Sequence, residues 1–435
     1  MIDKIFILES DELSSKDLMA YIEKHTTLKE RYRVLEDYYV GKHPILGQAP
    51  KPDYKPDNRI VVNYPKYIVD TLNGFFMGVP VKVSHDDEAV DDYLKEISRI
   101  NNLEDSDSDL SKKCSIYGHA FELLFLDEDG NVGITQISPM ECFIIYDDSI
   151  RRRPLYGVRY RVDSDGNIQG TISDDLTIKY FSIVKNEFSY TDEIRHYFGE
   201  VPIVEYVENE ERIGAFEPVE TLINAYNKAI SEKANDVDYF ADAYLKILGA
   251  KLEKEDLEVI RDNRIINLPT EDTDKLIVEF MEKPNADKTQ ENLIDRLEKQ
   301  IFATSMVANI NDENFGTSSG IALKYKLLSM TNLVNTKERK FMKSFNHRYR
   351  LISNLPNSKI SYDDLVGINY KFTKNIPQNT VEEADIAKSL RGIVSNETLL
   401  ENLSMISDSK AEVERLKEEE GYNVGLDYEY EEHEE

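Results

Sequence analysis

A loop rich in glycine and serine, followed by a basic helix, contains the residues of this chain best suited to bind an anion. Residues 309–320 read Asn-Ile-Asn-Asp-Glu-Asn-Phe-Gly-Thr-Ser-Ser-Gly, and small polar groups of this kind can meet phosphates without reading bases. Residues 321–352 then contain eight Lys or Arg and one acid, Glu338, a local charge of +7 in a protein of formal charge -30. This asymmetry indicates a surface that meets an anion. The alternative is a solvated helix face whose cations pair with acids elsewhere in the fold.

The same loop contains the letters of a hydrolase nucleophile elbow, G-x-S-x-G, at residues 316–320. An elbow needs a buried strand before it, and an acid and then a histidine later in the chain. The preceding residues, 309–314, are polar, and the only histidine beyond His347 is His433, in the acidic C-terminal tail. The sequence therefore argues against a hydrolase.

Two short acidic runs resemble the opening of a calcium-binding loop. Residues 127–131 read Asp-Glu-Asp-Gly-Asn, and residues 163–167 read Asp-Ser-Asp-Gly-Asn. An EF-hand places glycine sixth and a bidentate glutamate twelfth, whereas here glycine is fourth and strand-like segments flank it. Both runs are predicted to be hairpin turns.

No other pattern supports catalysis. No G-x-x-x-x-G-K-[ST] motif occurs, and the seven histidines lack the spacing of metal ligands. We therefore predict no enzyme activity, no catalytic residue, no metal site and no cofactor. A basic run at residues 151–153 could bind an anion or pair with neighbouring acids.

The bulk composition indicates a globular protein of two to four domains. The chain has 435 residues, of which 40% are hydrophobic and 31% charged. It contains no apolar run near the roughly 18 residues that a membrane span needs, and residues 5–8 are too short for a signal-peptide core. Its cysteines, Cys114 and Cys142, lie outside any cluster, so we expect buried, reduced thiols in a cytosolic protein. The net charge argues against a general DNA-coating protein but allows one that surrounds DNA without gripping it.

The first half is predicted to combine helices with antiparallel strands. A helix over residues 14–40 is capped by Ser14 or Ser15 and ended by Gly41, and Pro65 begins a second helix that ends near Met77. Further expected elements are a helical surface segment at 84–111 with an acidic loop at 105–109, and hairpins through 121–137 and from 158 onward.

The second half is predicted to be mostly helical. Apolar residues at helical spacing indicate one long helix up to Leu248 and a second over 288–308, with a small mixed segment between them that contains strand-like runs at 264–268 and 275–280. Such an antiparallel excursion suits a stalk with a tip. The basic helix is expected to bend near residues 329–332, and it is followed by a strand at 367–372 and short helices at 380–420.

Four segments, in order, resemble portal proteins of tailed bacteriophages, of the siphophage type common in Gram-positive hosts. Residues 315–326, Phe-Gly-Thr-Ser-Ser-Gly-Ile-Ala-Leu-Lys-Tyr-Lys, resemble the tunnel-loop region of that family. Residues 58–80 resemble its N-terminal signature, residues 116–127 the start of its wing sheet, and residues 375–385 the start of its crown. The resemblance covers about residues 15 to 420.

The resemblance implies an α+β, mainly α, portal fold. Its parts would be a wing, a long-helix stem, a small α/β clip, a tunnel loop with a long kinked helix, and a helical crown. The implied boundaries are 1–216 for the wing, 217–248 for the stem helix, 249–287 for the clip, 288–308 for the second stem helix, 309–320 for the tunnel loop, 321–375 for the long basic helix and a wing strand, and 376–435 for the crown with a mobile acidic tail.

The resemblance also implies a function. Portal proteins form a homo-oligomeric ring, usually of twelve subunits, at one capsid vertex, and double-stranded DNA passes through it during packaging and ejection. The implied partners are terminase, the major capsid or scaffolding protein and a head-completion (adaptor) protein, without a membrane. The protein would reside in the virion, and in the host cytoplasm during assembly. The residues expected to face DNA are Asn311, Asn314, Gly316, Thr317, Ser318, Ser319, Gly320, Lys324 and Lys326.

Two other functional classes stay open from the residues alone. One is a nucleic-acid-processing enzyme, which lacks any metal, nucleotide or nucleophile constellation here. The other is a coiled-coil scaffold protein without a channel, which particle shape would distinguish from a ring.

Overall fold

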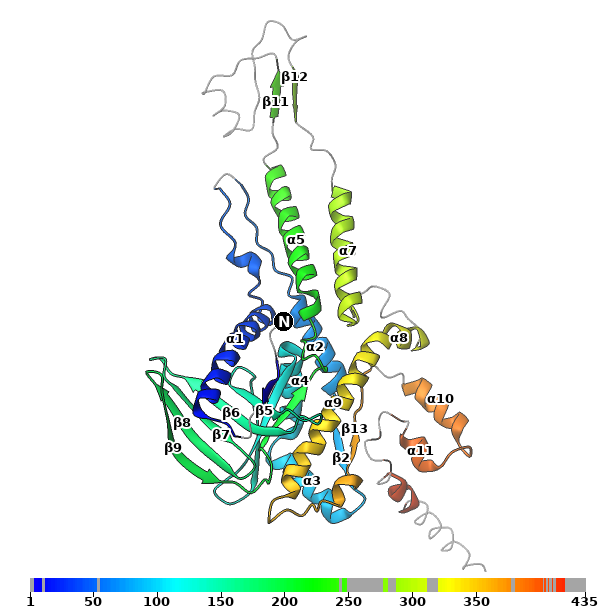
Figure 1. The fold of residues 1–435 in the computed structure, drawn as a ribbon. Helices are drawn as coiled ribbons and strands as arrows, with labels where there is room; N and C mark the ends of the chain where they lie inside the picture. Colours follow the sequence, from blue (N-terminus) through cyan, green and yellow to red (C-terminus); the bar gives the residue numbers. More distant parts are fainter. Residues whose placement is uncertain are drawn as a thin grey trace, which may run out of the picture. The chain divides into compact units, whose positions relative to one another are not determined.

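The computed structural model describes residues 4–9, 12–52, 55–241, 245–248, 277–280, 287–310, 320–376, 380–401, and 403, 406, 409 and 412–418 (Figure 1). The chain forms two compact units, which are treated separately: Met1–Asp312 with Lys326–Thr373, and Glu313–Tyr325 with Lys374–Glu435. In the described ranges, no helix is both long and apolar enough to cross a membrane.

The first helix, α1 (Ser15–Tyr39), has the predicted bounds. Its capping box is reciprocal: Ser14 Oγ accepts from the Asp17 amide, and the Asp17 carboxylate accepts from the Ser14 amide, both at 3.2 Å. The chain leaves the helix through Gly41, whose φ of +89° a residue with a Cβ rarely adopts. Local sequence signals therefore determine both ends of this helix.

Three further helices complete the helical part of the N-terminal half. They are α2 (Tyr64–Met77), with Pro65 in its first turn, α3 (Glu88–Ile100) and α4 (Leu103–Tyr117). The acidic loop predicted at 105–109 is wrong, because these residues lie inside α4. Leu103 and Leu110 are buried, and Asp107 pairs with a distant arginine, so tertiary contacts outweigh the local preference of Ser and Asp for turns.

Two sheets hold the core of the first unit. A six-stranded sheet has the order β1-β5-β6-β7-β8-β9, with β1 parallel to β5 and the other neighbours antiparallel. A three-stranded antiparallel sheet has the order β10-β3-β4. The strands are β1 (Phe6–Leu8), β3 (His119–Leu126), β4 (Val132–Ile137), β5 (Cys142–Asp147), β6 (Pro154–Val162), β7 (Ile168–Ser173), β8 (Thr177–Val184), β9 (Glu187–Arg195) and β10 (Ile203–Val207).

The two sheets share an apolar core, and α1 covers the other face of the larger sheet near β5 and β6 (Figure 1). The shared cluster consists of Phe121, Ile137, Cys142, Ile144, Val201 and Ile203. Cys114 and Cys142 are both buried and free, as predicted, and burial raises the pKa of each thiol.

Both predicted hairpins are confirmed, and their turns have the same hydrogen bonds. Asp127 Oδ1 accepts from the amides of Asp129 and Asn131 at 3.0 and 2.7 Å, and Asp163 Oδ1 accepts from those of Asp165 and Asn167 at 2.9 and 2.8 Å. The first carboxylate of each acidic run therefore closes a turn between two antiparallel strands, as the hairpin interpretation required.

Two antiparallel helices extend from this core, α5 (Glu220–Ala241), which follows the 3-10 turn η2 (Glu217–Val219), and α7 (Asp287–Ser305) (Figure 1). They are joined by the ion pair of Lys233 with Glu291 and by Gln290 Nε2, which donates to Asp236 Oδ2 at 2.9 Å. Beyond them β11 (Leu245–Leu248) pairs antiparallel with β12 (Ile277–Phe280).

The predicted helix boundaries need two corrections in this region. The helix predicted to reach Leu248 ends at Ala241, because residues 245–248 pair with a strand 30 residues later and are not part of the helix. The second helix ends at Ser305 and not at 308, and the next residue has a φ of +60°. The strand predicted at 264–268 lies outside the described residues.

The basic helix is interrupted earlier than predicted. It consists of α8 (Gly320–Lys326) and α9 (Leu328–Ser353), which meet at Leu327 and not at residues 329–332. The strand predicted at 367–372 is β13 (Asn369–Lys371), antiparallel to β2 (Lys82–Ser84). The second unit contains α10 (Thr380–Leu390) and α11 (Asn396–Glu401), and the terminal residues 428–435, predicted to be mobile, lie outside the described part of the chain. The fold is α+β, as predicted.

Candidate functional site

The predicted DNA-facing segment is described only at its C-terminal end. Six of the nine predicted residues lie outside the described ranges: Asn311, Asn314, Gly316, Thr317, Ser318 and Ser319. Gly320 is the first residue of α8, and Lys324 and Lys326 are exposed on the same helix. Tyr325, which the sequence reasoning did not select, is 74% exposed between the two lysines. Residues two apart do not share a helix face, so α8 presents cations on more than one side.

Within α9 the cations divide into two groups. Lys337, Lys340, Arg348 and Arg350 pair with carboxylates on other elements: Glu208, Glu210, Asp107 with Glu122, and Glu200. Arg339 and Lys343 are exposed and form no ion pair with any residue of the described ranges. Four of the eight cations in residues 321–352, which were predicted to mark an anion-binding surface, therefore pair with carboxylates of the chain itself, as the alternative interpretation proposed.

Arg348 occupies the centre of a buried charge cluster. Its side chain is 1% exposed, and its Nε lies 2.9 Å from Glu122 Oε1 on β3. Its terminal nitrogens pair with both Glu122 and Asp107 of α4, and its guanidinium carbon lies 4.7 Å from the ring centre of Phe345. Burial raises the pKa of Glu122, and Arg348 opposes that shift. This cluster joins α9, α4 and β3 at one point.

Lys337 forms a second buried anchor about three turns earlier in α9. Its Nζ lies 2.6 Å from Glu208 Oε2, and it donates to Ser115 Oγ at 2.7 Å and to the Ser111 carbonyl at 3.1 Å. Both charged side chains are almost inaccessible to solvent, at 1% and 3% exposure. Both cations of α9 are thus fixed to α4. Arg348 is also fixed to β3 and Lys337 to the chain after β10, and together these contacts set the rotation and the position of α9.

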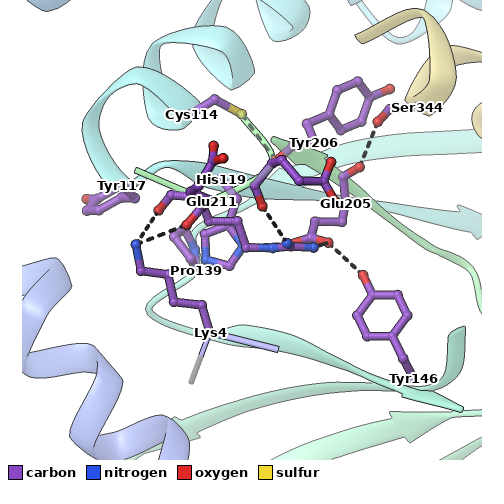
Figure 2. Close-up of polar contacts among 12 residues, drawn as sticks. Lys4, Cys114, Tyr117, His119, Pro139, Tyr146, Glu205, Tyr206, Glu211 and Ser344 are labelled. Atoms are coloured by element: carbon purple, nitrogen blue, oxygen red, sulfur yellow. Dashed lines mark hydrogen bonds and ion pairs between the residues drawn. The ribbon is translucent and has the colours of Figure 1, made fainter. Parts of the chain in front are cut away.

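The third cluster surrounds Glu205 on β10 (Figure 2). Its carboxylate accepts from Arg212 Nε at 2.7 Å, from His119 Nδ1 at 2.7 Å and from the Tyr146 hydroxyl at 2.6 Å. Burial disfavours its ionised form, but Arg212 and His119 hold the pKa of Glu205 well below its usual range. The backbone carbonyl of Glu205 also accepts from Ser344 Oγ of α9 at 2.7 Å, so this carboxylate cluster and α9 are directly joined.

The segment that leads from Arg212 into α5 is held by two further cations. Arg31 of α1 forms a bidentate pair with Glu217 and donates to the Tyr117 and Arg212 carbonyls, both at 3.1 Å. Lys4 Nζ donates to the Arg212 carbonyl at 2.9 Å and to that of Glu211 at 3.2 Å (Figure 2). The chains approach so closely that a Cβ on Gly118, whose φ is +90°, would lie 2.1 Å from the Arg212 oxygen.

An extended strap, residues 58–62, runs along α5 through a repeated side-chain contact. Asn227 Oδ1, Ser231 Oγ and Asn235 Oδ1 accept from the backbone amides of residues 62, 60 and 58 at 2.9, 2.9 and 2.6 Å. A spacing of four on the helix matches a spacing of two on an extended chain, since both cover about 6–7 Å. This ladder lies inside the predicted N-terminal signature, although the sequence did not reveal its partner.

These arrangements bind structural elements to one another and do not form a reactive site. Across the described ranges no group of three or more His, Cys, Asp or Glu could hold a metal ion. The buried cations face carboxylates and carbonyls of the chain itself, so they are neutralised and closed to a ligand. One sequence signal could have found the Arg348 cluster: Glu122 is an acid within an otherwise apolar strand.

Comparison with known proteins gives consistent matches. The chain matches the family described as "Phage portal protein, SPP1 Gp6-like" over residues 18–425. A portal protein of Clostridium phage phiCD119 is 24% identical over 442 residues, covering 93% of this chain and 95% of the relative. The portal protein of Bacillus phage SPP1 is 23% identical over 448 residues, covering 96% and 86%. A solved structure described as "Neck of empty GTA particle computed with C6 symmetry" has a TM-score of 0.48 and 12% identity, covering 81% of this chain and 95% of that chain.

Proposed function

The chain belongs to the phage portal proteins of the SPP1 Gp6-like family, and from this membership we propose that it forms a ring whose channel double-stranded DNA crosses during packaging and ejection. The observation that carries the proposal is the extent of the match, since residues 18–425 include nearly the whole chain. The ring would contain twelve subunits and would stand at one capsid vertex as a structural component of the phage particle. It would assemble in the host cytoplasm.

The elements of the first unit suit the parts of such a ring. We assign the wing to the two sheets with α1 to α4, the stem to α5 and α7, and the clip to the segment between them, which contains β11 and β12. The clip would dock terminase during packaging and the head-completion protein afterwards. The wing would meet the major capsid or scaffolding protein, and the segment from residue 376 would form the crown.

We assign the contact with DNA to residues 309–320 and to Lys324 and Lys326 behind them. A protein of charge -30 repels phosphate over most of its surface, so a few exposed cations at one constriction would hold DNA without gripping it elsewhere. The exposure of both lysines on α8 supports this assignment, as does the neutralisation of Lys337 and Arg348 within the fold. Contacts to phosphate would make the interaction independent of sequence.

We propose further that this chain performs no catalysis and binds no metal or cofactor, so that terminase supplies the energy for packaging. The chain has no phosphate-cradling loop of the G-x-x-x-x-G-K-[ST] type. ATP turnover by the purified protein that one substitution in this chain abolished would contradict the proposal.

Stiffening the loop tests the DNA-contact assignment. The variant Gly316→Pro with Gly320→Pro should assemble into rings of wild-type mass, measured by light scattering, and should fail to package DNA into proheads. Gly320 opens a helix, where proline is tolerated, so the change should leave α8 intact. If rings failed to form, the loop would be structural. If packaging were normal, the DNA-contact role would be wrong.

A further inference from the structure

The loop between β5 and β6 of the larger sheet presents an isoleucine to solvent. Ile150, between β5 and β6, is 105% exposed, more than any other large hydrophobic residue in the described ranges. The loop is fixed by Asp147, whose Oδ1 accepts from Ser149 Oγ at 2.7 Å and from the Arg153 amide at 2.8 Å. Arg152 closes it with an amide that donates to the Ser149 carbonyl at 3.0 Å. The apolar side chain is therefore held outward on a preformed loop and is not part of the core.

Three arginines, residues 151–153, follow this isoleucine directly. All three are exposed, and Arg151 and Arg152 form no ion pair with an acid anywhere in the described parts of the chain. Within the described residues, pairing with neighbouring acids, the alternative raised by the sequence, therefore does not account for Arg151 and Arg152. Arginine is among the residue types that are enriched at the hot spots of protein interfaces.

A hollow elsewhere on the same unit differs from the Ile150 loop in shape and in charge, because it is concave and has acids at its edge. It has a volume of about 380 Å³ and lies between the C-terminal part of α3, the β3–β4 hairpin and the chain after α9. Its apolar lining includes Ile97, Ile100, Val132 and Pro356, and Ile100 is 59% exposed. Two acids that form no ion pair within the described residues stand on one hairpin turn at its edge: Asp129 lines it and Glu128 is exposed beside it, whereas Glu96, which also lines it, pairs with Lys359 of the same lining.

We propose that the Ile150 loop of one subunit docks into this hollow on the neighbouring copy of the chain, with Ile150 in the hollow and Arg151 and Arg152 facing Glu128 and Asp129. The proposal rests on the ring proposed above. A closed ring of identical subunits needs two different, complementary patches on each copy. Among the described residues, this chain carries an exposed isoleucine beside two arginines without ion pairs, and a hollow with an apolar lining and acids at its edge, which together satisfy that requirement by shape and by charge.

Disulfide trapping tests the contact directly. The variant Ile150→Cys with Ile100→Cys should, under mild oxidation, give a ladder of covalent multimers on a non-reducing gel. Each subunit would then link to the next, which requires Cβ atoms about 4 Å apart. The native cysteines are fully buried and should give no background. The matched control is Leu46→Cys with Ile100→Cys, which places an exposed thiol on the segment between α1 and α2 and should stay monomeric on the gel.

Charge reversal provides a second measurement that does not depend on disulfide geometry. Arg151→Glu with Arg152→Glu should raise the protein concentration needed for half assembly at least tenfold, and adding Glu128→Arg with Asp129→Arg should restore assembly. Rings that form normally without cross-links, and without any effect of the reversals, would overturn the contact and leave the ring standing. A wild-type protein that stays at 50.3 kDa under all conditions would overturn both.

Discussion

At the scale of single residues, the basic helix has two separate roles for its cations. Arg348 and Lys337 lie on the same stretch of sequence as exposed Arg339 and Lys343, yet the first two are enclosed with carboxylates of α4, β3 and the segment after β10. Taking charges out of water costs free energy, and the loss is offset only when each charge finds well-placed partners. Arg348 and Lys337 therefore serve to position α9. Removing one member of a buried pair should reveal this role as a loss of stability.

We predict that Arg348→Met lowers the free energy of unfolding by about 3–5 kcal/mol, because Glu122 and Asp107 would remain buried without their cation. Urea denaturation at one fixed protein concentration measures the change. Arg339→Met on the same helix is the matched control and should stay within about 0.5 kcal/mol of wild type. Equal effects of the two substitutions would show that the buried cluster does not anchor α9.

A second residue-scale prediction concerns acid. His25 is buried between α1 and β6, where Nδ1 lies 2.9 Å from the Tyr160 hydroxyl and Nε2 lies 2.9 Å from the Pro139 carbonyl. Burial and then the charge of Lys29 lower the pKa of His25 to about 3. The unfolded chain protonates this residue below about pH 6.5, so the folded state loses about 1.4 kcal/mol per pH unit between pH 6.5 and 3 from this group.

The variant His25→Gln should lack that component of the slope. We expect its stability, relative to wild type, to be constant above pH 7 and to improve by about 1.4 kcal/mol for each unit below pH 6.5. Thermal unfolding between pH 8 and 5 measures both proteins. A parallel pH dependence would mean that His25 titrates normally in the folded state.

At the scale of elements, the position of α5 depends on its contacts with the strap at residues 58–62 and with α1. The helix carries the ladder of Asn227, Ser231 and Asn235 that holds the strap, and the 3-10 turn η2 before it is tied to α1 through Glu217 and Arg31. Backbone amides need hydrogen-bond acceptors when they are removed from water. These three side chains supply the acceptors that a neighbouring strand would supply in a sheet. Each of the three contacts between the strap and α5 should therefore be removable by substituting its side chain alone.

We predict that Ser231→Ala leaves α5 intact and frees the amide of Ile60, which then lacks its 2.9 Å acceptor. The cost should be about 1–3 kcal/mol if the amide stays buried, and less if the strap moves outward to reach water. Hydrogen exchange resolved at residues 58–62 distinguishes the two. Lys228→Ala, an exposed position on the same helix, is the control and should leave the exchange rates unchanged.

At the scale of the whole molecule, the charge of -30 sets a condition on assembly. Subunits brought together in a ring repel one another, and salt screens that repulsion over a distance that shrinks from about 30 Å at 0.01 M to about 8 Å at 0.15 M. In the proposed ring, the apolar contact of Ile150 depends much less on salt over this range, and the proposed contacts of Arg151 and Arg152 with acids are few against the net charge of -30.

We predict that the assembled fraction rises with ionic strength between 0.01 and 0.15 M at constant protein concentration. Light scattering reads the mass directly against the subunit value of 50.3 kDa. The same series run with a neutral osmolyte at matched osmolality separates screening from crowding. An assembled fraction that fell with salt would show that attraction between opposite charges, and not net repulsion, governs assembly.

The sequence alone determined the elements whose signals are local. The N-cap serine of α1, the proline at residue 65 and the two Asp-x-Asp-Gly-Asn turns each fix a backbone conformation within a few residues. The proline and both turns lie where they were predicted, and of the two candidate caps, Ser14 and Ser15, the structure has Ser14. Four ordered motifs also indicated the family, because their order in the chain needs no tertiary information. The same local reading identified the exposed lysines of α8 as candidates.

Only the tertiary structure decided the features that depend on distant partners. The end of α5 at Ala241 follows from strand pairing between 245–248 and 277–280, and the helical state of Asp107 follows from Arg348, 241 residues later. The fate of each cation in α9 was likewise open, because helical periodicity gives the face of a residue but not what covers that face. Whether a charge is buried with a partner or left for a ligand is a property of the folded contacts, and the sequence does not contain it in any local pattern.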